Sequence, residues 1–237
     1  IYEYETGGFG YSPDIGREHD PDHEILNLSD YRIRHSYYKL DPDLRLLHQQ
    51  YPWITVWDDH ESANDAWKDG AQNHDSGTEG DWSERKSISA QAYYEWMPIR
   101  KPDPNDDERI YRKISYGDLV DFLMLDARIE GRDEQIPVTD PGLNDSARTI
   151  LGSQQMDWLK SELDNSQKQW KVLMQQVMMA PLQIFGSPLN ADQWDGYPAE
   201  RDRLLQHIVQ NNLENIVVLT GDIPVSYTHL TLPTNRC

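Results

Sequence analysis

The chain has 237 residues, a length that fits one large domain or two small ones. Its formal net charge of −19 argues against binding to nucleic-acid backbones or to anionic membrane surfaces, because both need Lys and Arg. No apolar run reaches about 18 residues, so we expect no transmembrane helix. The single cysteine, Cys237, excludes a disulfide framework and a zinc–thiolate site.

In the first half of the chain, the sequence predicts two helices and one buried strand. Asp41 is a helix N-cap residue followed by Pro42, which fits the first helical position, so we expect a helix that ends at Gln50. The β-branched and aromatic residues at 53–56 indicate a short strand. A second helix is expected at 84–97, and irregular segments at 1–30, 68–83 and 101–108.

The second half alternates strands with helices. Strands are expected at 110–115 and 119–125, joined by a tight turn, and again at 170–177 and 216–219. Helices are expected at 154–163, with Ser153 as the N-cap, and at 199–209. Residues 129–149 have the composition of a loop. This alternation predicts a layered α/β fold.

Two of the predicted strands end in acidic groups. The strand at 53–56 leads into Trp57-Asp58-Asp59-His60-Glu61, and the strand at 216–219 leads into Asp222 after a glycine that permits a sharp turn. Ligands of α/β sheets bind beyond the carboxyl ends of strands, so these groups are candidates for a divalent-metal site. The alternative is a solvated acidic turn at each place.

Other polar residues also have two interpretations each. Asn64 lies one turn beyond the acidic run, where it either contacts a ligand or caps a turn. Arg128 and Arg132 follow a strand and suit phosphate oxygens, or form a surface pair with Asp126 that contributes little. The segment with Asp195 and Tyr197 either lines a pocket or packs on the domain.

Five segments together resemble the PhoD-like alkaline phosphatases, in the order found in that family. The similarity runs from Ile1 to Ile223 and implies a calcineurin-like αββα metallophosphoesterase sandwich, incomplete here, with residues 1–223 as part of its catalytic domain. The segments are WDDHESAND (57–65), MLDARIEGRDEQ (124–135), SQQMDWLKSELDNSQKQWKVLMQQVMMAPL (153–182), DQWDGYPAER (192–201) and NIVVLTGDI (215–223).

The resemblance implies a site that holds Ca²⁺ and Fe³⁺. Its metal-binding residues would be Tyr2, Asp59, Asn64 and Asp222, with His60 and Arg128 as catalytic residues. Contacts to a phosphate-ester substrate would come from Arg128, Arg132, Asp195 and Tyr197. The implied reaction is hydrolysis of phosphate mono- or diesters in the periplasm or outside the cell; oligomeric state is not implied.

The chain departs from the family in two places. The opening IYEYETGG is similar to the family motif GDYIYEY without its first three residues, which include a bridging Asp, and an upstream Cys ligand is also missing. Pro224 stands where the family has a His ligand, and residues 224–237 resemble translated sequencing adaptor, so His229 is not counted as a ligand. We therefore expect this polypeptide to be inactive, with turnover no higher than that of Asp222→Ala.

Two alternative functions remain open from the residues alone. A glycosidase would use a carboxylate pair drawn from Asp58, Asp59 and Glu61 and would survive chelation. A non-catalytic acidic module would bind calcium diffusely through the charge of −19.

Overall fold

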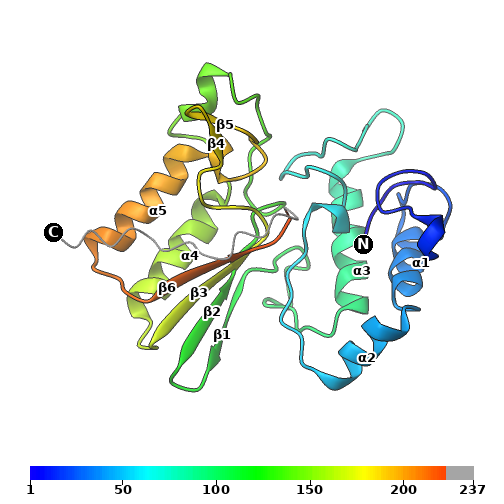
Figure 1. Cartoon of the computed structure of the whole chain (residues 1–237), viewed down its shortest axis with the longest axis horizontal. Coiled ribbons are helices and arrows are strands. Elements are labelled where there is room, and N and C mark those ends of the chain that lie inside the picture. The colour runs from blue at the N-terminus through cyan, green and yellow to red at the C-terminus, as the bar shows by residue number, and fades with distance from the viewer. Residues whose placement is uncertain (223–237) are drawn as a thin grey trace. The chain divides into compact units, whose positions relative to one another are not determined.

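The computed structural model describes residues 1–222, so Pro224 and the predicted non-native tail at 224–237 lie outside it. The chain forms two compact units, Ile1–Ile110 and the part that begins at Tyr111 (Figure 1). Within the described residues, no helix has both the length and the apolar character that a membrane crossing requires.

The first unit is built on two packed helices. Helix α1 (Leu28–Tyr38) lies against α3 (Trp82–Trp96), and α2 (Pro42–Gln50) follows α1 (Figure 1). Ile25, Tyr31 and Ala92 form a small core between α1 and α3, and all three are fully buried. Short 3-10 turns occur at Pro13–Ile15 and Asp59–Glu61.

Two of the helices of this unit follow from local signals in the sequence. The prediction for α2 is confirmed: the Asp41 side chain accepts the backbone N–H groups of Asp43 (2.9 Å) and Leu44 (2.8 Å). Helix α3 is also confirmed and begins at Trp82, two residues before the predicted start. Helix α1 was missed, although Asn27 caps it by accepting the Asp30 N–H at 3.1 Å.

The predicted strand at 53–56 is wrong. These residues belong to no strand and are half-buried. β-branched and aromatic residues favour a strand only when a neighbouring strand supplies hydrogen bonds and packing. Here the aromatic rings pack on helices instead: Trp53 stacks on His48 with centroids 4.0 Å apart, and Trp57 meets Tyr93 edge-on at 5.6 Å.

The second unit carries a four-stranded sheet in the order β1-β2-β3-β6. The hairpin β1–β2 is antiparallel, whereas β2, β3 and β6 are parallel and are connected through α4 and α5. The elements are β1 (Arg112–Tyr116), β2 (Val120–Met124), α4 (Gly152–Asn165), β3 (Trp170–Gln175), α5 (Pro198–Gln210) and β6 (Ile216–Thr220), with a short β4–β5 hairpin (Gln183–Ile184 and Ser187–Pro188). The predicted α/β fold is therefore confirmed.

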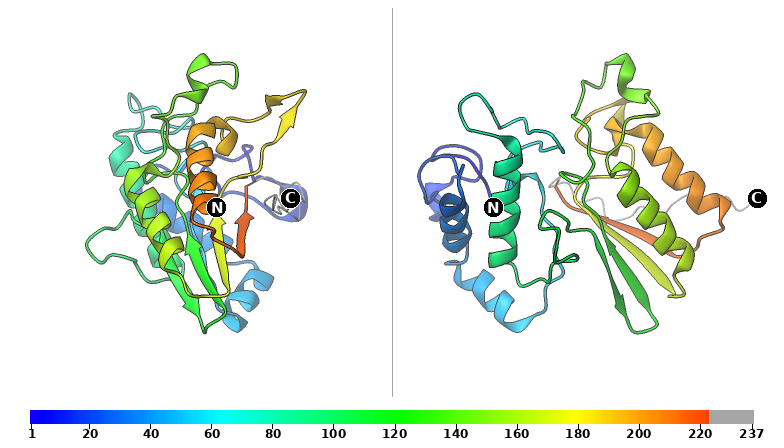
Figure 2. Two further views of the ribbon diagram at one scale, coloured as in Figure 1. Left: turned by 90° about the vertical axis from the view of Figure 1, so that its left-hand side faces the viewer. Right: turned by 180° about the vertical axis from the view of Figure 1, so that it is seen from behind.

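Helices α4 and α5 cover the same face of this sheet (Figure 2). Leu123 and Leu173 are aligned across β2 and β3 and are fully buried. They belong to one core with Leu159 of α4 and Leu204 of α5. Such burial contributes roughly 1.5–3 kcal/mol for each large aliphatic side chain, so this core fixes the strand ends from which the candidate residues project.

The start of α4 differs from the prediction. Ser153 lies inside the helix, not at its N-cap, and Leu151 occupies the cap position without a side-chain cap. The carboxylate of Glu200, in the first turn of α5, accepts the backbone N–H groups of Ile150 and Leu151 instead. A residue distant in sequence thus accepts the buried N–H groups that lead into this helix, which local spacing does not reveal, while Thr149 Oγ1 accepts the Gly152 N–H at 2.7 Å.

Candidate functional site

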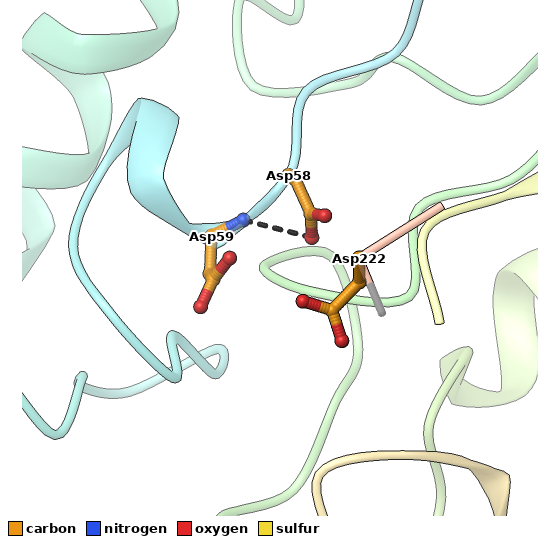
Figure 3. A group of neighbouring side chains, drawn as sticks. All are labelled: Asp58, Asp59 and Asp222. Carbon is orange, nitrogen blue, oxygen red and sulfur yellow. Dashed lines mark hydrogen bonds between the residues drawn. The ribbon is translucent and has the colours of Figure 1, made fainter. Parts of the chain in front are cut away.

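The acidic run of the first unit is a closed turn. Asp58 and Glu61 form a capping box, in which the Asp58 N–H donates to Glu61 Oε2 at 2.7 Å. The Asp58 carboxylate accepts the Asp59 N–H at 3.0 Å (Figure 3). This pairing closes the turn around Asp59 and His60.

Asp59 and Asn64 are held by the loop that follows this turn. Asp59 is 3% exposed, and its Oδ2 accepts the Asp65 N–H at 2.7 Å, where Asp65 has a positive φ of 52°. The Asn64 amide nitrogen donates to Gln72 at 2.9 Å, so its carbonyl oxygen is the atom that a cation would bind. Carboxylate and amide oxygens suit a hard cation such as Ca²⁺, so these two residues fit the implied metal.

His60 is paired with a buried carboxylate, that of Glu3, which the sequence analysis does not single out. Its Nδ1 lies 2.7 Å from Glu3 Oε2, and Glu3 is 0% exposed. Burial alone would lower the pKa of His60, but the hydrogen bond to Glu3 and the charge of Asp59 raise it above its usual value. For Glu3, burial acts to raise the pKa, and the contact with His60 outweighs it and lowers the pKa.

The segment that carries Tyr2 and Glu3 is fixed by Arg34. This fully buried guanidinium donates only to backbone carbonyl oxygens, and the ring of Tyr2 lies 4.6 Å from the ring of His60, centroid to centroid. The acceptors are Tyr2, Tyr4 (3.0 Å), Asp20 (3.1 Å), Pro21 (2.8 Å) and His23 (3.3 Å). Arg34 thus places Tyr2 beside His60.

In the second unit, Asp222 (labelled in Figure 3) lies two residues beyond Thr220, the last residue of β6. The Gly221 N–H donates to the Gln176 backbone oxygen at 2.9 Å, which continues the pairing with β3. The sharp turn lies at Asp222 itself, with φ of 65°, and not at the glycine as expected. Asp residues tolerate this left-handed conformation better than most side chains, so the turn re-aims the carboxylate.

Arg128 and Arg132 form a buried ionic cluster, not the surface pair considered as the alternative. Arg128 Nη1 contacts both carboxylate oxygens of Asp192, at 2.9 and 2.8 Å, and Arg132 donates to the same carboxylate. Both arginines are 0% exposed. Burial alone would raise the pKa of Asp192, but the two guanidinium charges lower it. Arg128 Nη2 also lies 3.6 Å from Asp222 Oδ1, which links the cluster to the end of β6.

Asp195 and Tyr197 have structural partners within the second unit. Asp195 accepts the Leu182 N–H at 2.7 Å and pairs with Arg201 at 2.6 Å. The Tyr197 hydroxyl donates to the Asp133 backbone oxygen at 2.6 Å, and Arg132 lies 5.4 Å from the centre of its ring. These contacts favour the packing interpretation of the two residues, while their predicted contact with substrate stays a prediction.

The sequence profile of the PhoD-like phosphatases matches residues 1–233. The chain belongs to the PhoD-like phosphatase family. It is 40% identical over 239 aligned residues to alkaline phosphatase D of Bacillus subtilis (strain 168), an alignment that covers 96% of this chain. A solved structure of PhoD is similar with a TM-score of 0.82 and 36% identity over 94% of this chain. The chain spans 40% of the length of the former relative and 44% of the latter chain.

As a member of the PhoD-like family, the chain shares the fold that the resemblance implied. The predicted domain boundary at residue 223 stays a prediction.

Sequence reasoning missed Glu3, Arg34 and Asp192, which contact the candidate residues or hold them in place. For Asp192 the signal was available, because an acidic residue in a polar and aromatic segment is the natural partner of two arginines in another motif.

Proposed function

We propose that this chain is part of an enzyme that hydrolyses phosphate mono- or diesters with a metal-activated water. The observation that supports it most is the acidic turn at 58–61, in a member of the PhoD-like family, with its His60 held by a buried carboxylate. A glycosidase needs a carboxylate pair that is free to act on substrate. Asp58 and Glu61 instead cap the turn with their carboxylates.

The proposed metal-binding residues are Tyr2, Asp59, Asn64 and Asp222, with Ca²⁺ and Fe³⁺ as the metals. Metals in such a site lower the pKa of a bound water and offset the charge of phosphate oxygens. His60 would hold or accept a proton at its exposed edge. Arg128 would supply positive charge near the phosphate, while Arg132, Asp195 and Tyr197 hold the surrounding structure.

We also propose that the whole protein acts outside the cytoplasm, in the periplasm or after secretion, on a phosphate ester. For the 237-residue polypeptide itself, we propose turnover no higher than that of Asp222→Ala, because Pro224 replaces the imidazole ligand that the resemblance implies. Proline has no side-chain atom that binds a metal.

Binding of the reaction product tests this proposal without turnover. Inorganic phosphate is titrated into the 237-residue chain, with and without added Ca²⁺ and Fe³⁺, and followed by ³¹P NMR line broadening in the calcium-only arm and by calorimetry in both. We expect phosphate binding only with metal, weakened by Asn64→Ala and unchanged by Asn105→Ala, a matched change in an exposed loop. Phosphate binding whose affinity changes neither with added metal nor with Asn64→Ala would contradict the proposal.

A further inference from the structure

We propose that Glu3 is a positioning residue that fixes the direction of the His60 ring and its tautomer when the ring is neutral, so that the Nε2 lone pair of the neutral ring is available to the site. This inference rests on the proposed function for the role of His60. Its structural basis is a single buried carboxylate that contacts two candidate residues, His60 and Asn64.

With Glu3 ionised, its hydrogen bonds leave only one proton assignment for a neutral His60 ring. Oε2 faces His60 Nδ1 at 2.7 Å, while Oε1 accepts the Asn64 N–H at 2.7 Å and the Asn73 side-chain amide at 3.1 Å. The Asn64 N–H and the Asn73 NH₂ can only donate, so Glu3 serves as an acceptor on that side. An ionised carboxylate likewise accepts from Nδ1, which places the proton of a neutral ring on Nδ1.

The other nitrogen of the ring is therefore left for the site. Within residues 1–222, His60 Nε2 makes no hydrogen bond, and the His60 side chain is 23% exposed. The rings of Tyr2 and Tyr4 flank the imidazole, with centroids 4.6 and 5.7 Å away. The ring thus has a defined orientation, and its exposed lone pair suits a metal ion or a proton from substrate.

Glu3 is itself held in place by its backbone. Its carbonyl oxygen accepts the Ile25 N–H at 3.0 Å. The neighbouring carbonyl groups of Tyr2 and Tyr4 accept from Arg34. Because Glu3 is fixed at both its backbone and its carboxylate, it can hold the His60 ring and the loop that carries Asn64 in fixed positions.

The variant Glu3→Gln separates positioning from packing, because glutamine has nearly the same size and shape. Its amide has one acceptor oxygen and one donor nitrogen. If the oxygen faces His60, the NH₂ group meets the donors of both Asn64 and Asn73, a conflict that no proton shift relieves, so this orientation is disfavoured. If the amide flips, the NH₂ group meets Nδ1–H, and the ring avoids this conflict only by moving its proton to Nε2.

The test is ¹⁵N NMR of the histidine rings in the 237-residue chain without metal, at a pH where His60 is neutral. Signals of His60 are assigned by their loss in His60→Gln. We expect the Nδ1–H tautomer in the native chain and a shift toward Nε2–H in Glu3→Gln. The matched control Glu24→Gln, which also removes a carboxylate bonded to Asn73, should leave the tautomer unchanged.

An Nε2–H tautomer in the native chain would overturn the proposal, even if Glu3→Gln failed to fold. A tautomer that does not respond to Glu3→Gln in a folded variant would overturn it as well. Neither result depends on phosphate binding. Conversely, a native Nδ1–H tautomer combined with metal-independent phosphate binding would contradict the proposed function and leave the role of Glu3 intact. If the chain binds metal, Glu3→Gln should lower the metal affinity by about 10–100-fold.

Discussion

At the scale of residues, the buried cluster around Asp192 shows how charge is accommodated in the second unit. One carboxylate faces two fully buried guanidinium groups and also accepts from Gln135 at 2.8 Å. Burying these charges costs free energy that only close pairing offsets. The cluster therefore stabilises the fold only while all partners are present, and it fixes the direction of Arg128.

Asp192→Asn should consequently be costly. The change keeps the size of the side chain but removes the negative charge that both buried guanidinium groups share, and we expect a loss of about 3 kcal/mol in the free energy of unfolding. Urea unfolding at neutral pH measures it. Asp164→Asn, which alters an Asp that is 42% exposed and paired with His207, serves as the control and should change stability by less than about 1 kcal/mol. Equal effects of the two variants would refute the role of the cluster.

His35 gives the first unit a distinct response to acid. Burial, with the charges of the N-terminal ammonium group and Lys39, lowers the pKa of His35 from 6.5 to about 3. Between these values the unfolded chain binds a proton that the folded chain does not. Stability should therefore fall with decreasing pH by up to about 1.4 kcal/mol per pH unit from this residue.

His35→Phe should remove this acid sensitivity, because phenylalanine fills a similar space without a titrating group. The free energies of unfolding of the two chains are compared at several pH values from about 7 down to 4.5. We expect the advantage of the variant to grow as the pH falls. A difference that stays constant over this range would show that His35 does not titrate differently on folding.

At the scale of elements, sequence reasoning succeeded where the signal was local. Helix α2 follows from Asp41 and Pro42, and the β1–β2 hairpin follows from two apolar runs around a glycine turn. It failed where partners came from elsewhere. The 53–56 segment lacked a neighbouring strand, and the start of α4 depends on Glu200. Most site residues were candidates from the sequence pattern, but their roles came from the family resemblance, since consecutive acidic residues do not reveal which side chain points where.

The approach of two glycines sets the position of α4. A Cβ atom on Gly131 would lie 2.5 Å from Gly152 Cα and 2.6 Å from the Leu151 backbone oxygen, and neither backbone atom can move without shifting the helix. Gly131→Ala should therefore cost about 1–3 kcal/mol of stability.

Thermal unfolding measures this cost. Gly142→Ala is the matched control, because its new Cβ would mainly meet the exposed Asp140 carboxylate at 3.1 Å, which accepts the Gly142 N–H and needs to shift only by a few tenths of an ångström. We expect a small effect there. If Gly131→Ala unfolded at the temperature of the native chain, the close packing described for this pair would be incorrect.

At the scale of the whole molecule, the charge of −19 and the family membership make different predictions about calcium. An excess of surface carboxylates attracts cations weakly, at many places, and salt screens this attraction. A site built from Asp59 and Asn64 binds in a fixed stoichiometry and depends on individual residues. Composition alone could not separate these cases, whereas the geometry of the turn at 58–65 gives residues to test.

Calorimetric titration of Ca²⁺ into the 237-residue chain, in buffer with added salt, distinguishes a specific calcium site from diffuse binding. We expect stoichiometric binding that Asp59→Asn abolishes and that Asp106→Asn, the same change in an exposed acidic loop, leaves intact. Binding that is weak, unsaturated and equally reduced by both variants would contradict this expectation and would identify the chain as a diffuse acidic cation binder.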